Sequence, residues 1–398
     1  MITRRYFMRS AALAVAGSGI APGWLLRATA QGQSRRKILI SIFQRGAADG
    51  LNVVVPYCEK TYYDLRPTIA VPAPGTKPNS AIDLDGRFGL HPSLMPLKPF
   101  WDSQKLAIIH ATGSPDGNRS HFEAQDAMES GMAGRTTEEG WLNRALAPVV
   151  DTTSPLRAIA IGAKMPRTLR GNRGAVAIGD LQQFQAKNSE VASIIEGMYA
   201  ASPESPLIKQ GKGAFDAVRM IESINRDQAP GRVQYGFGEF GKALQQIARL
   251  IKADVGVEAA FADIGGWDHH TNEVPQLTGL LQQFGTSLAA FANDMGDRME
   301  DIVLVTMSEF GRTAKEDGNG GTDHGHGNVM MVLGGKVQGG KVYGRWPGLE
   351  PEQLFERRDL AVTTDYRDVL GELVTKHLGR IPEEVFPGFT SAPPLGLL

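Results

Sequence analysis

The stretch KILISIFQRGAADGLNVVVP, residues 37–56, decides the fold class of this chain. It begins with a β-branched apolar run, residues 38–43, and then breaks into a glycine-rich turn. An apolar run of this length, interrupted only by Ser41, is typical of a strand that is buried on both faces of a parallel sheet. The stretch therefore predicts a buried strand whose carboxyl end delivers Arg45, Asp49 and Asn52.

The same pattern, an apolar run followed by polar residues, recurs along the chain. Further strands are predicted at residues 106–111, 156–162, 255–270, 301–313 and 328–335. Helices are predicted from residue 120 onward and near residues 188–200, 212–227, 236–253, 274–298 and 364–378. This alternation predicts a three-layer α/β/α fold, with a mostly parallel central sheet and helices on both of its faces. Two turn-rich segments, residues 57–91 and 163–235, are expected to be insertions that form a cap or rim over the sheet's carboxyl edge.

The first 30 residues have the features of an export signal. Residues 3–9, TRRYFMR, hold two adjacent arginines followed by an aromatic, an apolar and a basic residue, which resembles the twin-arginine export motif. The apolar run at 11–26 is too short and too broken to span a membrane, and residues 28–30, ATA, fit a cleavage site. An ordinary amphipathic first helix is the alternative. We expect residues 31–398 to be one exported domain, periplasmic or secreted, with the twin-arginine translocase as its partner during export.

The bulk composition excludes several classes of protein. A chain of 398 residues with 42% hydrophobic and 21% charged residues suits a soluble globular protein. The formal net charge of −1 argues against a nucleic-acid binder that works through a broad basic field, and no other stretch predicts a stable membrane span. The single cysteine, Cys58, excludes an internal disulfide and a thiolate zinc site. We expect Cys58 to be half-buried, as free cysteines tend to be.

Acidic residues and histidines gather where the predicted strands end. Six of the eight histidines lie in or beside these segments, and ligands of open parallel sheets bind beyond the carboxyl ends of the strands. The candidate metal ligands are Asp49, Asp263, Asp268, His270, Glu309, Asp323, His324 and His326. A mixture of carboxylates and imidazoles favours Zn or Mn over Mg or Ca. The sequence therefore predicts one or two divalent ions, Zn or Mn, at this edge.

Each of these segments also has a plain structural interpretation. Asp49 can stabilise an Asp-Gly turn. Ser120 can be the N-cap of a helix, forming a capping box with Glu123. Glu309 can pair with Arg312 across one turn, an interaction worth only a few tenths of a kcal/mol on a surface. The two histidine-rich stretches can be solvated loops. A metal site is favoured because all of these segments are predicted to meet at one edge of one sheet.

Several motifs, in order, resemble the family catalogued as domain of unknown function 1501. They are RGAADGLNVVVP, HPSLMPL, NRSHFEAQDAMESG, IGGWDHHTN, SEFGRT and GTDHGHG, and together they extend over nearly the whole mature chain. The family is placed with the alkaline-phosphatase-like superfamily, whose members hydrolyse or transfer phosphate and sulfate esters. They use a metal pair and a Ser, Thr or modified Cys nucleophile at the start of a helix. The resemblance implies a single domain of that fold over residues 31–398.

The resemblance also implies roles for individual residues. Asp49, at the end of the first strand, resembles the first metal-binding aspartate. Ser120, in GNRSHFEAQ, resembles the nucleophile at the N-terminus of its helix. The segment DHGHGNVMMV resembles the one that carries the last metal-binding histidine. The cysteine motif of the formylglycine sulfatases is absent, because Cys58 stands in YCEKTYY.

This chain departs from the superfamily pattern at two places. The superfamily has an aspartate and a histidine four residues apart, but the position four after Asp263 is Trp267. Asp268 and His270 would have to serve instead. In SEFG, Glu309 can replace a metal-binding aspartate, but Phe310 cannot replace the histidine that follows it. One metal site is therefore expected to be weakened, lost, or rebuilt from other histidines. The candidates for rebuilding it are His121, His324 and His326.

The expected function is that of an exported metal-dependent hydrolase acting on a small anionic phosphate, sulfate or related ester. Ser120 is the candidate nucleophile, and His121 or His324 is expected to protonate the leaving group. The arginines expected to grip the ester oxygens are Arg45, Arg119 and Arg312. The alternative is a non-catalytic metal- or ligand-binding protein that kept the fold and lost part of the metal site. A surface or assembly protein is a third possibility, and it predicts a large exposed apolar patch.

Overall fold

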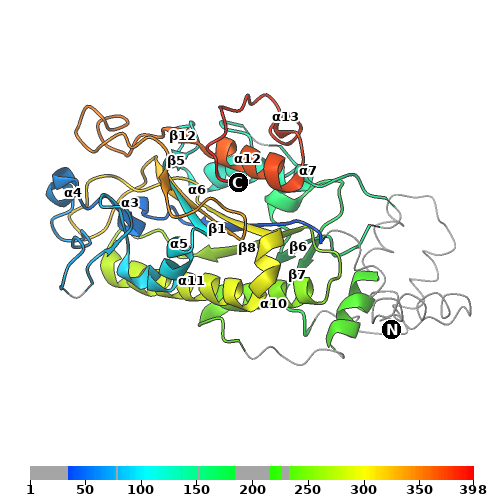
Figure 1. Cartoon of the computed structure of the whole chain (residues 1–398). Helices are drawn as coiled ribbons and strands as arrows, with labels where there is room; N and C mark the ends of the chain where they lie inside the picture. Colours follow the sequence, from blue (N-terminus) through cyan, green and yellow to red (C-terminus); the bar gives the residue numbers. More distant parts are fainter. Residues whose placement is uncertain (1–34, 78, 136, 151–152, 184–215, 226–232) are drawn as a thin grey trace, which may run out of the picture. The chain divides into compact units, whose positions relative to one another are not determined.

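The apolar run at residues 38–43 forms β1 (Ile38–Arg45), a strand in the middle of the main sheet of the computed structural model (Figure 1). β1 pairs in parallel with β8 (Ala259–Gly265) on one side and with β9 (Ile302–Met307) on the other. All of its residues except Arg45 are buried, as expected for a strand that is covered on both faces. The predicted buried strand is thus confirmed.

The structure describes residues 35–77, 79–135, 137–150, 153–183, 216–225 and 233–398. Within this part of the chain, Lys37–Leu398 forms one compact unit. The expected export signal at residues 1–30 and the expected helix at 188–200 lie outside the described residues. Of the helices that the structure describes, none is both long and apolar enough to cross a membrane.

The main sheet has nine strands among the described residues. Their order is β11, β5, β10, β9, β1, β8, β6 and β7, and β12 also pairs with β5. The bounds not yet given are Val342–Tyr343 (β11), Leu106–Gly113 (β5), Asn328–Gly334 (β10), Ala158–Ile161 (β6), Val176–Ile178 (β7) and Thr364–Asp365 (β12). Neighbouring strands are parallel except where β10 pairs with β5 and β9. The predicted mostly parallel sheet is confirmed.

The reversed direction of β10 determines where the histidine-rich loop lies. Because β10 is antiparallel to β9 and β5, its first residue, Asn328, stands at the carboxyl edge of the parallel strands. The loop of residues 308–327, which joins β9 to β10, therefore begins and ends at that edge. A parallel β10 would instead require a crossover to the opposite edge before the strand began.

Helices cover both faces of the sheet (Figure 1). On one face, α10 (Gly238–Lys252) and α11 (Glu273–Met295) share a buried core with the even-numbered isoleucines of β1. On the other face, α7 (Trp141–Ala145), α12 (Tyr366–Leu378) and α13 (Pro382–Val385) pack with the odd-numbered apolar side chains of β1. Alternate side chains of one strand thus enter two separate cores, which confirms the predicted three layers.

The two expected insertions differ in what they form. Residues 57–91 contain α4 (Lys60–Leu65) and complete a small antiparallel sheet, which also includes residues just before them. That sheet consists of β2 (Val54–Val55), β4 (Gly89–Leu90) and β3 (Ile82–Asp83). Of residues 163–235, the described part includes β7, an unpredicted strand of the central sheet, and a helix at residues 216–225. Cys58 is exposed, and its expected half-burial is wrong because it lies in the surface turn that follows β2.

The remaining elements are short. They are α3 (Gly50–Val53), α5 (Lys98–Asp102), α6 (His121–Ser130) and the 3₁₀ helices η2 (Pro92–Leu97), η3 (Arg167–Leu169) and η4 (Gly296–Asp301). α6 begins after Ser120 as predicted, but Ser120 makes no side-chain cap hydrogen bond. Its backbone nitrogen donates to Oδ1 of Asn118, and Nδ2 of Asn118 donates to Glu123. The predicted capping box is therefore wrong, because Asn118 takes the partners that the box would use.

Candidate metal centre

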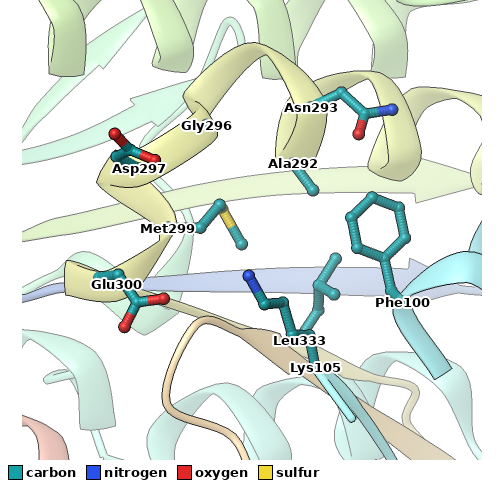
Figure 2. A pocket seen from close by; sticks show the side chains of 9 residues that line it. All are labelled: Phe100, Lys105, Ala292, Asn293, Gly296, Asp297, Met299, Glu300 and Leu333. Atoms are coloured by element: carbon teal, nitrogen blue, oxygen red, sulfur yellow. The ribbon is translucent and has the colours of Figure 1, made fainter. Parts of the chain in front are cut away.

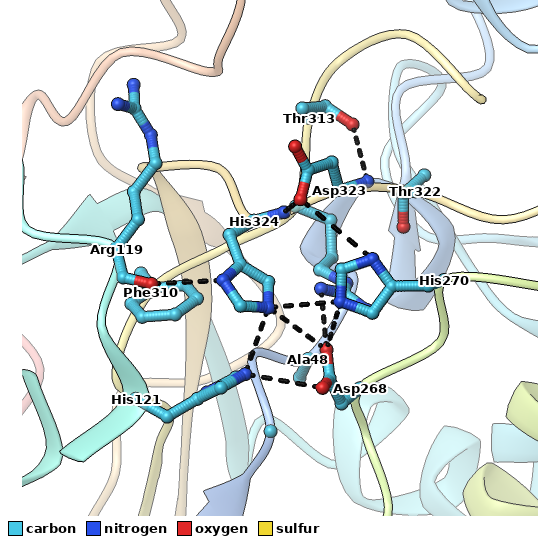
Figure 3. A network of polar contacts seen from close by, with 12 residues as sticks. Ala48, Arg119, His121, Asp268, His270, Phe310, Thr313, Thr322, Asp323 and His324 are labelled. Carbon is cyan, nitrogen blue, oxygen red and sulfur yellow. Dashed lines mark hydrogen bonds and ion pairs between the residues drawn. The ribbon is translucent and has the colours of Figure 1, made fainter.

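Three histidines and one aspartate from separate segments converge at the carboxyl edge of the sheet (Figure 3). Nε2 of His324 lies 3.0 Å from Nε2 of His121 and 3.1 Å from Nε2 of His270. Oδ1 of Asp268 lies 3.2 Å from Nε2 of His324 and 2.8 Å from Nε2 of His270. His121 is the first residue of α6, Asp268 and His270 follow β8, and His324 precedes β10. The structure thus brings these four predicted site residues together.

Two overlapping groups of side chains have the spacing of metal ligands. One consists of His121, Asp268 and His324, and the other of His270, Asp323 and His324. In each group, one ligand atom per residue lies within 4.8 Å of the others. Ligand atoms around a tetrahedral zinc ion, with Zn–N bonds of 2.0–2.1 Å, are about 3.3 Å apart. The separations around His324 are close to that value, and His324 is the residue common to both groups.

In two of the histidine rings, the hydrogen bond made by Nδ1 determines whether Nε2 carries a proton. Nδ1 of His324 lies 3.0 Å from the carbonyl oxygen of Arg119, which can only accept, so Nδ1 must donate. Nδ1 of His121 lies 2.8 Å from Oε1 of Glu309, and the carboxylate likewise accepts. In neutral rings, both Nε2 atoms then carry lone pairs that face each other at 3.0 Å. Such lone pairs repel unless a cation or a proton lies between them, so this arrangement fits a bound metal ion.

Glu309 lies behind His121 and outside both ligand groups. Its side chain is fully buried and accepts hydrogen bonds from His121, from Nε2 of Gln125 and from the backbone nitrogen of Gly46. Burial acts to raise the pKa of Glu309, but the hydrogen bonds from His121 and Gln125 lower it overall. Glu309, which was predicted as a ligand, therefore holds the ring of His121 in place and belongs to neither ligand group.

The turn after β1 packs closely against the segments that carry Glu309 and Asp268. Gly46 has a φ of +118°, and a Cβ atom on it would lie 2.8 Å from the backbone nitrogen of Asp268. Only glycine fits so close an approach in this conformation.

Phe310 stands where the superfamily pattern has a histidine, and its ring stacks on that of His121 with centroids 5.0 Å apart. It also lies 5.1 Å from the ring of His324, and thus packs against both imidazoles.

The charges of the site shift its ionisable groups in different directions. The hydrogen bond to Glu309 raises the pKa of His121, whereas burial lowers the pKa of His324. Burial acts to raise the pKa of Asp268, but the charge of Arg312 and the neighbouring histidines lower it overall. Asp268 is thus held as an anion, which is the form that binds a metal ion.

The structure places Asp49 in a different, buried network. Both of its carboxylate oxygens accept hydrogen bonds from Arg66, at 2.5 and 2.9 Å, and Asp49 belongs to neither ligand group. Arg66 also donates to the backbone oxygen of Thr313, whose own backbone nitrogen donates to the carbonyl of Asp323. Burial acts to raise the pKa of Asp49, but Arg66 holds it below its ordinary value. Asp49 therefore supports the loop that carries the ligands, through an arginine of the 57–91 segment.

The other predicted ligands also have partners away from the histidines. Asp263 pairs with Arg45, 2.5 Å from its Nε, and neither residue belongs to a ligand group. The ring of His326 stacks on Phe355 with centroids 4.2 Å apart, and burial lowers the pKa of His326 to about 4. Three residues that were predicted to belong to the site, Arg45, Asp263 and His326, are thus engaged in an ion pair or in ring stacking.

The segment before α6 contributes its backbone as well as its side chains. The side chain of Arg119 extends away from the histidines in Figure 3 and pairs with Asp359 and Glu356. Its carbonyl, by contrast, holds the ring of His324. Ser120 is exposed and stands between these two contacts in sequence, because His121 follows it directly. The candidate nucleophile is therefore flanked by two residues that contact the cluster.

Sequence reasoning missed one residue that supports the histidine cluster and two that belong to the buried network of Asp49. Gln125 lies one helical turn after His121 and hydrogen-bonds Glu309, a spacing that a search for helix neighbours would find. Arg66 lies in a turn-rich segment without any motif. Glu273, the first residue of α11, accepts hydrogen bonds from Asn52 and Thr322. Burial and the charge of Asp49 raise the pKa of Glu273, and no sequence pattern indicates such a buried acid.

Two cavities lie away from the histidines. One, of about 290 Å³, is lined by residues of α5, the end of α11, η4 and the end of β10, and by Lys105, which directly precedes β5 (Figure 2). It therefore lies at the edge of the sheet where β5 and β9 begin, opposite the histidines. Its side chains include Lys105, Asp297 and Glu300, none of which belongs to a ligand group. The other, of about 560 Å³, lies between α11 and residues 68–96. Neither cavity contains the histidines of the cluster. The candidate site is therefore identified from the side chains of the cluster and not from a cavity.

Several solved structures are similar to this chain. They include the C-terminal periplasmic domain of EcEptC from Escherichia coli in complex with Zn (8% identity, TM-score 0.36, covering 77% of this chain and 75% of that chain). A protein in the alkaline phosphatase superfamily from Vibrio parahaemolyticus is 11% identical, with a TM-score of 0.33, and the match covers 77% of this chain and only 62% of that one. The PsFucS1 sulfatase from Pseudoalteromonas sp. is 10% identical, with a TM-score of 0.35, covering 94% of this chain and 72% of that chain. Similarities this remote assign no activity.

Curated proteins give no match to this chain. A family model does match, and its description is protein of unknown function (DUF1501). The match covers residues 36–381, which include every residue of the two ligand groups and the whole 308–327 loop. The chain therefore belongs to the DUF1501 family.

Proposed function

We propose that this protein binds a divalent metal ion through the histidine cluster and uses it to hydrolyse a small anionic ester of phosphate or sulfate. One observation carries the proposal: the Nε2 atoms of His121 and His324 lie 3.0 Å apart while their Nδ1 atoms face acceptors. Neutral imidazoles in this state direct lone pairs from both Nε2 atoms toward the position that a metal ion would occupy. Zn or Mn is the ion that this set of nitrogens and carboxylates favours.

The ligands and their supports have distinct roles in this proposal. His121, His324 and Asp268 hold the ion, and His270 and Asp323 form the second group around the shared His324. A bound divalent ion neutralises ester oxygens and lowers the pKa of a nucleophile next to it. Glu309 and the carbonyl of Arg119 keep the two imidazoles oriented. Ser120, exposed beside His121, is the nucleophile that we assign.

A non-catalytic metal-binding protein is the second candidate. Two observations favour it: Arg66 occupies both oxygens of Asp49, and Phe310 stands where a histidine was expected. A protein that holds only one ion is still a metal-binding protein, but the argument that it hydrolyses an ester is then weaker. The two functions share the metal site and differ in whether Ser120 reacts.

The test is an assay of the metal-loaded protein on aryl phosphates and aryl sulfates, with Zn and with Mn. We expect turnover by the wild type and none by Ser120→Ala, which should keep its metal content. Ser103→Ala is the matched control, since Ser103 directly follows α5 and its hydroxyl donates to carbonyls of that helix. Equal turnover by Ser120→Ala and wild type excludes Ser120 as the nucleophile. Absence of turnover in the metal-loaded wild type, on all substrates, supports the non-catalytic protein.

We further propose that residues 1–30 direct export by the twin-arginine route. The proposal rests on the arginine pair at positions 4 and 5 and on the small residues at 28–30. Cell fractionation of the full chain and of an Arg4→Lys, Arg5→Lys variant tests it. We expect the wild type in the periplasm or medium and the variant in the cytoplasm. The same distribution for both chains contradicts this route.

A further inference from the structure

The guanidinium of Arg312 is buried beside the cluster without hydrogen bonds. Its side chain is 0% exposed, and none of Nε, Nη1 and Nη2 has a hydrogen-bond partner among the described residues. Nη1 lies 3.0 Å from Oδ1 of Asp268, but this ion pair lacks the geometry of a hydrogen bond. A buried charged group without partners costs free energy, and native structures rarely keep one without a use.

The other two arginines expected to grip an ester already have partners. Arg45 donates to Asp263, Gln125 and Glu129. Arg119 donates to Glu356 and Asp359. Arg312 differs from both, because all of its donors remain available next to a proposed metal ligand. It is also fixed in place, since its backbone pairs with that of His324 and its neighbour Gly325 leaves no room for a Cβ atom.

The position of Arg312 suits an anion bound at the cluster. Asp268, the carboxylate that Nη1 approaches, is 44% exposed, so the guanidinium lies one side chain away from solvent. A divalent ion at the cluster and the charge of Arg312 would repel each other. An anion that contacts both removes this repulsion, and the planar guanidinium matches two oxygens of a tetrahedral oxyanion.

We propose that Arg312 recognises the anionic group of the ligand, so that the ion and Arg312 together bind a tetrahedral oxyanion. The inference rests on the proposed function, because it places the anion at the proposed metal site. It selects Arg312 among the three candidate arginines. It also predicts linkage: the ion and the anion should each bind more tightly when the other is present, by the same factor.

The experiment measures metal affinity and anion affinity separately by calorimetry, on wild type, Arg312→Gln and Arg312→Lys. The probes are Zn or Mn alone, then inorganic phosphate and inorganic sulfate with metal-loaded and metal-free protein. For Arg312→Gln, we expect anion affinity to fall on the order of tenfold or more, since a charge-assisted bidentate contact is lost. We expect its metal affinity to stay equal or rise, because a neighbouring positive charge is removed. A residue that only maintains the fold would lower both affinities.

Two further variants make the result specific. Arg312→Lys keeps the charge but loses the fork, so we expect wild-type metal affinity and intermediate anion affinity. Arg367→Gln removes an arginine that is paired with Asp365, outside both ligand groups, so we expect wild-type anion affinity. Tighter binding of phosphate than of sulfate, or the reverse, identifies the ester class.

The outcomes separate this inference from the proposed function. Wild-type anion affinity in Arg312→Gln, or no anion binding by any form of the wild type, overturns the inference. Failure of the wild type to take up metal overturns the proposed function instead. In that case, anion binding by the metal-free wild type and Arg312→Gln still decides the role of Arg312.

Discussion

Arg66 donates hydrogen bonds from Nη1 and Nη2 to the two carboxylate oxygens of Asp49, and neither side chain is more than 2% exposed. This buried pair joins the end of β1 to the 57–91 segment. Through the carbonyl of Thr313, Arg66 also contacts the loop that carries Asp323 and His324. Asp49 thus has a buried partner that a sequence cannot show, and it lies outside both ligand groups.

The first prediction concerns the stability of this pair. Asp49→Asn removes the carboxylate that is hydrogen-bonded to the buried guanidinium of Arg66 and leaves Glu273 as the acid that still acts on it. The free energy of unfolding should therefore fall by about 3–5 kcal/mol. Lys60→Ala, which breaks an exposed pair with Asp64, should cost less than about 1 kcal/mol. Denaturant unfolding measures both. An Asp49→Asn protein that keeps its stability but loses its metal would restore Asp49 as a ligand.

The second prediction concerns the turn at Gly46. A Cβ atom at this position would press on the backbone of Asp268, so Gly46→Ala should displace that ligand and weaken metal binding at least tenfold. Gly86→Ala is the control, because Gly86 also has a positive φ, of +83°, but open space around it. Gly86→Ala should lose about 1 kcal/mol of stability from backbone strain and keep its metal affinity. Equal metal affinities for both variants contradict the role given to Gly46.

The third prediction concerns pH. Burial lowers the pKa of His110 to about 4, and its neutral ring bonds the carbonyl of Val54 through Nε2 and the amide of Ala111 through Nδ1. A folded-state pKa below the unfolded value of about 6.5 gives stability that is fully present above that value. It is lost as pH falls from about 6.5 to 4, by up to about 3 kcal/mol for this residue. His110→Gln should flatten this part of the stability profile; an unchanged slope contradicts the assignment.

Much of the fold could be predicted because it depends on local patterns. The apolar run of β1 and the long amphipathic α10 and α11 carry their own periodicity, and their places are close to those expected. The direction of β10 could not be predicted, because its residues form a buried run that reads the same in a parallel or an antiparallel strand. That direction nevertheless decides that the loop before β10 lies at the ligand edge.

The candidate site likewise has residues that local patterns indicate and residues whose partners they do not. His270 and His324 stand in stretches rich in polar residues, and both were selected as candidates from the sequence. Asp268, which lies between the end of a predicted strand and His270, was selected with them. Glu309 and Asp49 were assigned as ligands because a sequence shows that an acid follows a strand, but not which group approaches it. The partners that redirect these two acids, His121 for Glu309 and Arg66 for Asp49, lie 188 and 17 residues away in the chain. Long-range contacts of this kind leave no local signal.

The most direct test of the account is the metal content of His324→Asn, compared with that of wild type and of His326→Asn. His324 belongs to both ligand groups, whereas His326 stands two residues later in the same loop and stacks on Phe355. Each protein is dialysed against Zn or Mn, washed free of loose ions, and analysed by mass spectrometry of the elements. The account predicts at least one ion per chain in wild type and His326→Asn, and none in His324→Asn. Metal retained equally by His324→Asn, or absent from all three proteins, would contradict it.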